Sequence, residues 1–311
     1  MSIASPNIAL IKYWCKGTEG TNAPAAGSVS FLIDPKSLWT ETRAELATDE
    51  KTRFWINGIE REVPEAYWRL SSAFPCLTRC PIHIHTTNNF PIGCGLASSA
   101  SGAAALVLEL DRLFSTHLSR RELSAAARVY SGSGARSIIM GVAEMIYDPN
   151  LPIEERWHAI PLEVHESLQS LKCLVVLFSS TEKTIGSTEA MNLCSGTTAM
   201  NARLKRIPER LKRCREALRI GDFNELAAVA TEDWRCMHSV IQDVIGLSYI
   251  TEAGWELAER IDARRKAGAQ IFITFDAGPN GVILGSAEAL REVYSLPIGN
   301  KLIFQCEVRL K

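Results

Sequence analysis

The sequence predicts an α+β protein built from two domains. Its 311 residues exceed the size of one typical folding core. Several β-forming runs come first, and a segment rich in helix formers follows them. The last third alternates strand, helices, strand, strand, helix and strand, which is the order of a split βαβ (ferredoxin-like) sheet with helices on one face.

In the first half, β-forming runs predict a mixed sheet that a helix covers. The predicted strands span residues 29–33, 39–47, 54–63 and 82–87, and the third of them is a hairpin that turns at Asn57-Gly58. Helix formers predict the first long helix over 103–114. Ser119 and Glu122 form a capping-box pattern, which opens a second helix that runs to about Tyr130.

In the second half, helical periodicity dominates. The composition shifts between residues 148 and 170, so we expect domains at 1–167 and 168–311. A strand is predicted over 173–178, then an amphipathic helix from Leu204 to Leu218 that ends at Gly221. The last predicted elements are a helix over 253–267, strands over 271–275 and 282–284, a helix over 286–294 and a strand over 302–308.

Composition excludes several classes of protein. A formal net charge of −1 argues against bulk binding to nucleic acid or to an anionic membrane. No apolar run is long enough to span a bilayer, and the first residues form no signal-peptide core. Nine cysteines without paired metal-ligand spacing favour reduced thiols in a cytoplasmic protein with no metal site of its own.

Basic residues crowd the helix that begins the second half. An RNA-binding module could use such a face, but no aromatic residues are interleaved with the basic ones, so a solvated face is the favoured interpretation. The residues predicted to lie on this exposed face are Arg203, Lys205, Arg206, Arg210, Lys212, Arg213, Arg215 and Arg219.

The stretch from Asn88 to Gly102 indicates an anion-binding loop between a strand and a helix. Gly93, Gly95 and Gly102 let backbone N–H groups converge at the positive end of the helix, and Ser98, Ser99 and Ser101 add hydroxyl donors. The alternative is a crossing of small residues where a helix packs on a sheet. The loop matches neither the P-loop nor the dinucleotide fingerprint, so a nucleotide bound here requires another fold.

Two further segments carry candidate binding groups. Lys12, Tyr13 and Lys16 place two cations and a phenol in one short span, although an edge strand with snorkelling lysines has the same pattern. Arg136 lies in the segment 131–137, between serines and before an apolar run, which is unusual for a linker. We interpret Arg136 as the centre of a bidentate anion clamp.

Asp276 follows a buried strand and opens the turn Asp276-Ala277-Gly278-Pro279-Asn280. Its carboxylate emerges at a strand end, where a catalytic base would be held rigidly. Aspartate is also common in turns, and a hairpin Asx-turn explains the residue equally well. The residues alone leave both interpretations open.

Taken together, these motifs closely resemble those of the mevalonate diphosphate decarboxylases of the GHMP kinase superfamily. The resemblance covers nearly the whole chain, with the motifs in the same order in both halves. The motifs that carry it are Pro6 to Trp14, Asn88 to Pro91 with Gly95 to Ala100, Ser131 to Ser137, Gly186-Ser187-Thr188 and Phe275 to Asn280.

The resemblance implies a GHMP kinase fold with the active site in the cleft between two domains, and a homodimer. It implies ATP and Mg²⁺, with Mg²⁺ bridging the phosphates, and a reaction that phosphorylates the 3-hydroxyl of mevalonate 5-diphosphate, expels that phosphate and releases carbon dioxide to give isopentenyl diphosphate. The implied catalytic residues are Asp276, Lys12, Arg136 and Ser99. The implied substrate-binding residues are Asn7, Tyr13, Lys16, Ser131, Ser133 and Arg136. The implied ATP-binding residues are Asn88, Gly95, Leu96, Ala97, Ser98, Ser99, Ala100, Ser101, Lys183 and Ser187.

Several positions depart from the family pattern. The family usually has glycine where Cys15 stands, Arg-Asp where Gly17-Thr18 follows, and Asn-Asp or Asn-Ser where Ala26-Gly27 stands. These positions border the implied substrate site, so the number of phosphates on the substrate stays open. A decarboxylase of mevalonate 5-phosphate is the nearest alternative, followed by a related small-molecule kinase.

Overall fold

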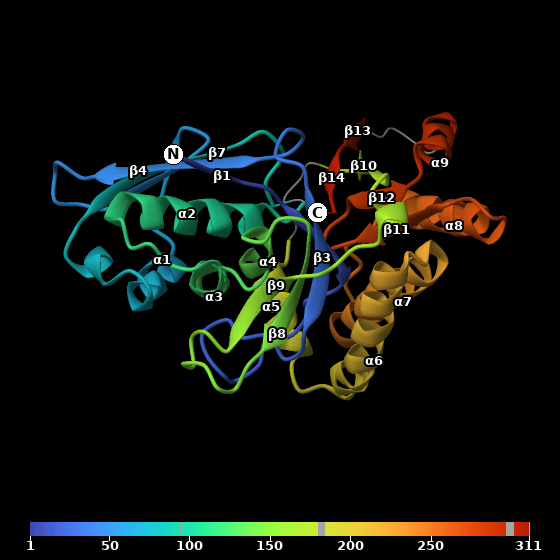
Figure 1. The fold of residues 1–311 in the computed structure, drawn as a ribbon, viewed down its shortest axis with the longest axis horizontal. Coiled ribbons are helices and arrows are strands. Elements are labelled where there is room, and N and C mark those ends of the chain that lie inside the picture. Colours follow the sequence, from blue (N-terminus) through green and yellow to red (C-terminus); the bar gives the residue numbers. More distant parts are fainter. Residues whose placement is uncertain (94, 180–183, 297–301, 311) are drawn as a thin grey trace.

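The computed structural model describes residues 1–93, 95–179, 184–296 and 302–310. The chain folds into two halves that lie side by side, and its C-terminal end lies near the junction between them (Figure 1). Each half contains β-sheet that packs against helices, as the alternation of strands and helices predicts. Within the described ranges, no helix is long and apolar enough to cross a bilayer.

The first sheet of the N-terminal half has the strand order β1-β4-β7-β5-β6. Its strands are β1 Ser2–Ala4, β4 Thr40–Leu46, β5 Arg53–Ile56, β6 Ile59–Arg61 and β7 Ile82–Asn88. Ile82, Ile84 and Thr86 of β7 are buried while the residues between them are more exposed, so one face of the sheet is covered and the other meets solvent. The predicted hairpin is confirmed: Asn57 and Gly58 both have positive φ, as a tight two-residue turn requires.

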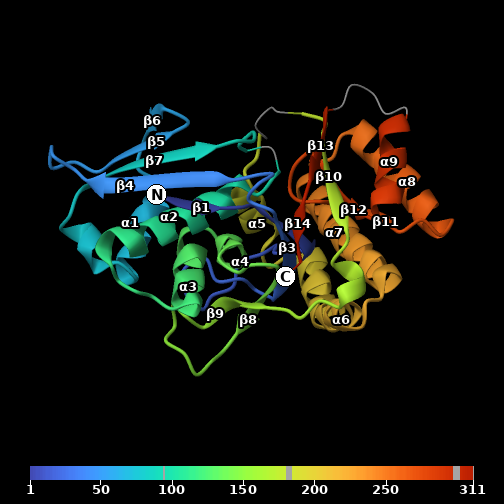
Figure 2. The ribbon, with the colours of Figure 1, turned by 45° about the horizontal axis from the view of Figure 1, so that its top comes forward.

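Helices pack under this sheet, and Figures 1 and 2 show α2 running along its face. Helix α2 begins at Ser98, five residues before the predicted start, because the small residues after the glycine loop already continue the helix. The capping box of Ser119 and Glu122 is confirmed at the start of α3. The helices of this half are α1 Glu65–Arg69, α2 Ser98–Phe114, α3 Arg120–Tyr130 and α4 Gly134–Ser137.

A second sheet of this half lies against the C-terminal half. It has the order β14-β3-β8-β9, and β2 also pairs with β3. The strands are β2 Asn7–Ile11, β3 Ser28–Ile33, β8 Val142–Tyr147, β9 Trp157–Pro161 and β14 Val308–Arg309. Every residue of β2 is buried, and Lys12, which follows it, is 3% exposed with its ammonium bonded to Asp276, so the snorkelling alternative is wrong for Lys12. The apolar core that contains β2 and β3 also takes in residues of the C-terminal half.

The C-terminal half is the predicted split βαβ arrangement. Its antiparallel sheet has the order β11-β12-β10-β13, and helices lie between β10 and β11 and between β12 and β13 along the chain. The strands are β10 Lys172–Leu177, β11 Ile271–Phe275, β12 Gly281–Gly285 and β13 Leu302–Cys306. The helices are α5 Ser187–Cys194, α6 Thr198–Ile220, α7 Phe223–Ile245, α8 Glu252–Lys266 and α9 Ala287–Arg291.

Two boundaries in this half differ from the prediction. The predicted closing strand over 302–308 is broken at Glu307, and β14 then pairs with β3 of the other half. The predicted helix over 286–294 is a short α9 followed by a 3₁₀ turn, Glu292–Ser295. Both differences depend on contacts with distant strands, which local patterns do not contain.

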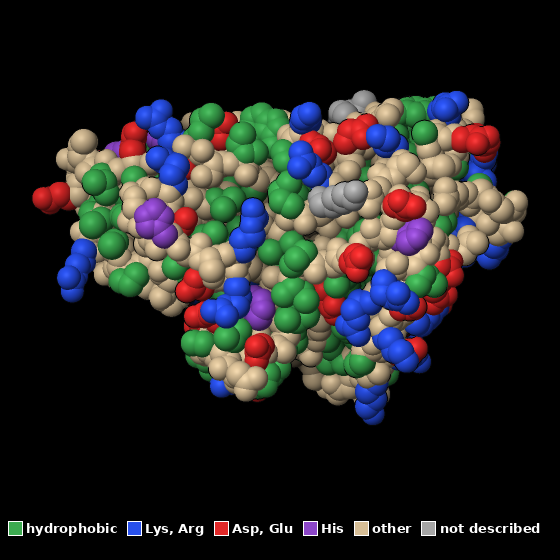
Figure 3. Space-filling view, in the orientation of Figure 1, with side chains coloured by type: hydrophobic (Ala, Val, Ile, Leu, Met, Phe, Trp, Pro, Cys, Tyr) green, Lys and Arg blue, Asp and Glu red, His purple; other side chains and the backbone are tan. Residues whose placement is uncertain are grey.

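The prediction of an exposed basic face on α6 is wrong for two of its arginines. Arg203 is 1% exposed and Arg210 is 7% exposed, and both bind the buried carboxylate of Asp233 on α7. Other basic residues of α6 pair with acidic neighbours, as Arg213 does with Glu225 and Glu232. Acidic and basic side chains are interspersed over this part of the surface (Figure 3). No uniform basic surface for RNA forms among these described residues.

Candidate active site

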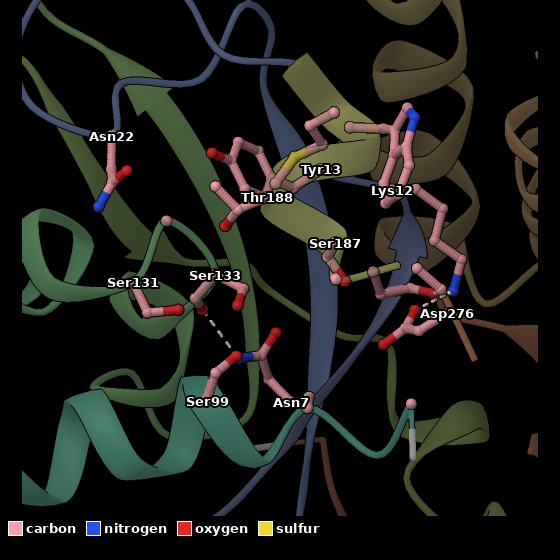
Figure 4. A pocket seen from close by; sticks show the side chains of 18 of the residues that line it. Asn7, Lys12, Tyr13, Asn22, Ser99, Ser131, Ser133, Ser187, Thr188 and Asp276 are labelled. Atoms are coloured by element: carbon pink, nitrogen blue, oxygen red, sulfur yellow. Dashed lines mark hydrogen bonds and ion pairs between the residues drawn. The ribbon is translucent and has the colours of Figure 1, made fainter. Parts of the chain in front are cut away.

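A cavity of about 450 Å³ lies between the two halves. One wall is formed by the end of β2, the glycine loop with the start of α2, and the segment 131–136. The other is formed by the first residues of α5 and by the turn after β11, which carries Asp276. Figure 4 shows the side chains of Lys12, Asp276, Ser99 and Ser133 converging on this space.

The glycine loop lines the cavity and lies close to the turn that carries Asp276. Gly93 and Gly95 both have positive φ, and a β-carbon on Gly95 would stand 2.7 Å from Cα of Gly278. Only glycine therefore allows this loop to approach the turn after Asp276. Within the described residues, no side chain caps the N-terminus of α2, whose N-cap residue is Ala97. The first N–H groups of a helix without a cap need an acceptor, and a phosphate oxygen is a suitable one.

The structure brings half of the implied ATP residues to the cavity. Those that line it are Gly95, Ala97, Ser98, Ser99 and Ser187. Leu96 and Ala100 are buried, and the Ser101 hydroxyl lies 2.6 Å from that of Thr40. Asn88 accepts a 2.6 Å hydrogen bond from the same threonine through Oδ1. Leu96, Ala100, Ser101 and Asn88 do not line the cavity, and the contacts of Ser101 and Asn88 with Thr40 hold the start of α2 against β4. Lys183 lies outside the described residues.

Lys12 and Asp276 form an ion pair at the base of the cavity. Lys12 Nζ donates to Asp276 Oδ1 at 2.5 Å and to the carbonyl of Ala9 at 2.6 Å. The lysine side chain is 2% exposed and the aspartate side chain 22% exposed. Burial lowers the pKa of Lys12, and the charge of Asp276 acts in the opposite direction. The pair therefore places a buried cation beside a carboxylate that still reaches the cavity.

This ion pair bears on the two interpretations of Asp276. In an Asx-turn the carboxylate would accept a hydrogen bond from the backbone of its own turn. Here the turn is closed by the backbone, since the N–H of Gly278 donates to the carbonyl of Asp276 at 2.7 Å. Among the described residues, the side-chain hydrogen bond of Asp276 goes to Lys12 instead. Its carboxylate is thus available for chemistry in the cavity.

Arg136 projects into the cavity from α4 but is 2% exposed. Its Nε donates to the hydroxyl of Ser30 at 2.9 Å and its Nη1 to that of Ser28 at 2.5 Å. Burial lowers the pKa of Arg136 to about 10, and the charge of Asp276 opposes this shift. The guanidinium plane is fixed by two neutral hydroxyls, which leave its positive charge uncompensated for an anion.

The substrate-side residues implied by the resemblance surround Arg136, and all of them line the cavity: Asn7, Tyr13, Lys16, Ser131 and Ser133. Asn7 Nδ2 donates to the carbonyl of Ser133 at 3.0 Å, while its buried Oδ1 has no partner among the described residues. The buried hydroxyl of Tyr13 also lacks one there. Burial raises the pKa of Tyr13 and lowers that of Lys16. A buried polar group without a partner is costly, so a bound polar ligand would compensate these atoms.

Sequence reasoning missed several residues of the site. Asn22 lines the cavity, as does Thr188, which was named only as part of a motif, and Ser28 with Ser30 orients Arg136. Ser28 and Ser30 alternate with apolar residues in a predicted strand, and this pattern could have indicated that both hydroxyls face a polar partner. Asn22 lies in the loop between β2 and β3 and has a positive φ of 52°. No local sequence pattern predicts its position in the cavity.

Comparisons with known proteins agree with this arrangement. The description "Diphosphomevalonate decarboxylase-like N-terminal domain" matches residues 4–150, and "Mevalonate 5-diphosphate decarboxylase C-terminal domain" matches 173–300. The diphosphomevalonate decarboxylase of Ganoderma lucidum is 30% identical to this chain, over 94% of the chain and 80% of that protein. The chain belongs to the diphosphomevalonate decarboxylase family. The N-terminal match contributes Lys12, the glycine loop and Arg136 to the cavity, and the C-terminal match contributes Asp276.

Solved structures of the same family share the whole fold. Mevalonate diphosphate decarboxylase from Staphylococcus aureus is 28% identical, with a TM-score of 0.86 over 99% of this chain and 94% of that one. A structure described as MDDEF in complex with MVAPP, AMPPCP and magnesium is 26% identical, with a TM-score of 0.88 over 99% of this chain and 96% of that one. The prediction of a two-domain GHMP kinase fold is confirmed.

Proposed function

We propose that this chain catalyses the ATP-dependent decarboxylation of mevalonate 5-diphosphate to isopentenyl diphosphate, with release of ADP, phosphate and carbon dioxide. The observation that carries the proposal is the position of Asp276. Its carboxylate is held by Lys12 at 2.5 Å and faces a cavity shared by the phosphate-type loop and Arg136. Membership of the diphosphomevalonate decarboxylase family supports the same activity.

Asp276 accepts the proton of the tertiary 3-hydroxyl as that oxygen attacks the γ-phosphorus of ATP. The new phosphate group is a far better leaving group than hydroxide. As it departs, the carbon–carbon bond to the carboxylate breaks, its electrons form the new double bond, and carbon dioxide leaves. Lys12 keeps the Asp276 carboxylate oriented throughout, because its ammonium is fixed by the carbonyl of Ala9 as well.

The remaining groups bind and orient the substrate. Its diphosphate and carboxylate carry several negative charges, which Arg136 and Lys16 meet together with the hydroxyls of Ser131 and Ser133. Asn7 and Tyr13 offer the buried polar atoms that lack a partner among the described residues. Because the cavity lies between two halves of the molecule, bound substrates exclude water from the carbon on which positive charge develops.

ATP and Mg²⁺ fit the cavity chemically. The open N-terminus of α2 and the hydroxyls of Ser98, Ser99 and Ser187 suit phosphate oxygens. No cluster of three or more His, Cys, Asp or Glu residues in the described ranges could hold a metal ion. Mg²⁺ would accordingly be bound by the phosphates with hydroxyl oxygens of this loop nearby, and it would neutralise charge on the transferred group.

The direct test supplies the purified chain with ATP, Mg²⁺ and mevalonate 5-diphosphate labelled in its carboxyl carbon. We expect labelled carbon dioxide and ADP to form in equal amounts. ADP without carbon dioxide would instead establish a kinase. Carbon dioxide from mevalonate 5-phosphate, but not from the diphosphate, would establish the alternative decarboxylase.

The domain boundary, the oligomeric state and the location belong to the same proposal. Domains at 1–167 and 168–311 are supported by the break between the two family matches, at 150 and 173. The eight described cysteines are all free thiols, which suits a cytoplasmic enzyme. A homodimer follows from the family resemblance, and light scattering would test it against the monomer mass of 34.3 kDa.

A further inference from the structure

A buried carboxylate on α7, that of Asp233, lies next to the ion pair of Lys12 and Asp276 and is bonded to the Lys12 backbone. Asp233 is 0% exposed, and both of its carboxylate oxygens are hydrogen-bonded by charged side chains of α6. Arg203 binds it in a bidentate manner, with Nη1 at 2.9 Å from Oδ1 and Nη2 at 2.9 Å from Oδ2. Arg210 Nη1 lies 2.9 Å from Oδ1. The three side chains form a rigid cluster, because each is buried and the Arg203 fork fixes the carboxylate plane.

This cluster holds the backbone of Lys12. The N–H of Lys12 donates to Asp233 Oδ2 at 2.7 Å, and Arg203 Nη2 donates to the Lys12 carbonyl at 3.4 Å. Both polar groups of the Lys12 backbone are thus engaged by residues that lie 221 and 191 positions away. Helices α6 and α7 therefore fix the point from which the lysine side chain starts.

The strand to which Lys12 is attached does not fix it. Strand β2 ends at Ile11, and its pairing with β3 shifts register between Ala9 and Ile11. Such an irregularity interrupts the ladder of backbone hydrogen bonds. Lys12 leaves the sheet at this point, and its ammonium turns back to the carbonyl of Ala9 and to Asp276. Among the described residues, the hydrogen bond that holds the Lys12 N–H in place is the one to Asp233.

We propose that Asp233, oriented by Arg203 and Arg210, is a positioning residue of the reaction: it sets the Lys12 backbone so that the lysine ammonium reaches the Asp276 carboxylate. The inference rests on the proposed function, since it assigns Asp276 the role of accepting the hydroxyl proton. It adds a structural requirement to that function, because the position of Lys12 relative to Asp276 then depends on helices α6 and α7 as well as on the residues that line the cavity.

If the cluster had a purely structural role, its removal would change the stability of the protein but not the reaction. Buried ion pairs often stabilise a helix pair without any effect on chemistry, and their removal then lowers stability alone. A positioning role also changes the Lys12 ammonium itself. Burial lowers the pKa of Lys12, and the charges of Asp276 and Asp233 both oppose that shift. Removal of the Asp233 charge should lower the pKa of Lys12 further.

Several charged or titratable groups face Lys12 and must be considered in any pH experiment. They belong to the turn after β11, to α7, to α6 and to α4, and they are Asp276, Asp233, His238, Arg203 and Arg136. Asp233 does not line the cavity but is bonded to the Lys12 N–H, so its replacement separates positioning from direct contact with the substrate.

The test compares Asp233→Asn with Glu232→Gln. The neighbouring Glu232 is bonded to Arg213 at the surface, so its replacement also removes one carboxylate from α7 but leaves Lys12 untouched. For each variant, kcat, the KM values for ATP and for mevalonate 5-diphosphate, the pH profile of kcat and the unfolding temperature are measured. The titration of Lys12 is followed by NMR of lysine labelled with ¹³C at Cε, which does not depend on turnover.

We expect Asp233→Asn to lower kcat by about 10- to 100-fold, to change both KM values less than threefold, and to move the Lys12 titration to lower pH. Glu232→Gln should match the wild type in each. If Asp233→Asn does not fold, Arg203→Lys tests the same point, because it keeps a cation but loses the bidentate fork and the contact with the Lys12 carbonyl. A folded variant with the wild-type kcat and Lys12 titration would overturn the proposal. Release of ADP without carbon dioxide by the wild type would overturn the proposed function instead, and kcat for ADP release would then test the positioning role.

Discussion

Replacement of Asp276 by asparagine separates the charge of this residue from its shape. Asparagine is nearly isosteric, and its Oδ1 can still accept the hydrogen bond from Lys12 Nζ, which spans 2.5 Å in the wild type. The backbone hydrogen bond that closes the turn, from the N–H of Gly278 to the carbonyl of residue 276, does not involve the side chain. The variant should therefore fold and bind ATP, yet lack a group that can take the hydroxyl proton.

The size of the effect follows from two losses. A positioned general base contributes roughly 10²- to 10⁴-fold to a rate, and at about 1.4 kcal/mol per tenfold this raises the barrier by about 3–5 kcal/mol. In addition, the ammonium of Lys12, whose side chain is 2% exposed, loses its anionic partner. The pKa of Lys12, already lowered by burial, should fall further. The variant should thus be less stable than the wild type at neutral pH, and the difference should shrink as the pH rises and Lys12 becomes neutral.

Single-turnover experiments with labelled ATP and mevalonate 5-diphosphate distinguish the steps. We expect Asp276→Asn to form neither ADP nor a 3-phosphorylated intermediate at an appreciable rate, while ATP binding measured by calorimetry stays close to the wild-type value. Accumulation of the 3-phosphorylated intermediate without carbon dioxide would place Asp276 in the second step and refute the role assigned to it. Wild-type turnover would return the residue to a purely architectural role.

Four further predictions concern the rest of the site. Arg136→Lys should lower kcat/KM by about 10- to 150-fold (about 1.5–3 kcal/mol), because an ammonium cannot hold two serine hydroxyls and an anion in one plane; kinetics within twofold of the wild type would exclude a clamp. Ser99→Ala should raise the KM for ATP while the unfolding temperature stays constant, and an unchanged KM would assign the loop to packing alone. Gly132→Ala places a β-carbon about 2.5 Å from the hydroxyl of Tyr13, so the KM for the mevalonate substrate should rise and that for ATP should not; equal changes in both would contradict this. Burial lowers the pKa of His238 to about 3, so between pH 3 and 6.5 the unfolded state binds one more proton than the folded state. The free energy of unfolding, measured with urea, should therefore fall by about 1.4 kcal/mol for each pH unit below 6.5. The variant His238→Asn should not show this fall.

Local patterns in the sequence predicted the elements that are stabilised by near neighbours. The hairpin at Asn57-Gly58 depends on two adjacent residues that adopt positive φ, and the start of α3 depends on Ser119 and Glu122 three positions apart. Gly221, with a φ of 80°, ends α6 for the same local reason. Such features need no knowledge of the tertiary structure, so the sequence reveals them directly.

The α6 helix shows where such reasoning fails. Its apolar positions predicted the helix correctly, but a pattern that treats every arginine as a surface residue places Arg203 and Arg210 in solvent. Their burial depends on Asp233, which lies 30 and 23 positions away on another helix. Charged residues are buried only when a partner compensates them, and the partner cannot be recognised from the spacing within one helix.

The same limit applies to the candidate site. The motif resemblance implied roles for Lys12, Arg136 and Asp276, but the residues alone left Asp276 open between a base and a turn. The contact that supports a role as a base joins Lys12 to Asp276 across 264 positions of sequence. It forms only because β2 is buried against α7 while β11 delivers its turn to the same place, which is a property of the whole fold.

The charges around this contact explain why the cavity favours anions despite the near-neutral chain. Lys12, Arg136, Arg203 and Arg210 carry positive charge here and Asp276 and Asp233 carry negative charge, while His238 stays neutral because burial lowers its pKa to about 3. The excess positive charge is nearest to Arg136, whose hydrogen-bond partners are neutral serines. Uncompensated buried charge is unfavourable, and a bound phosphate or carboxylate removes that cost. The arrangement that leaves Arg136 with neutral hydrogen-bond partners therefore favours a multiply charged substrate in this cavity.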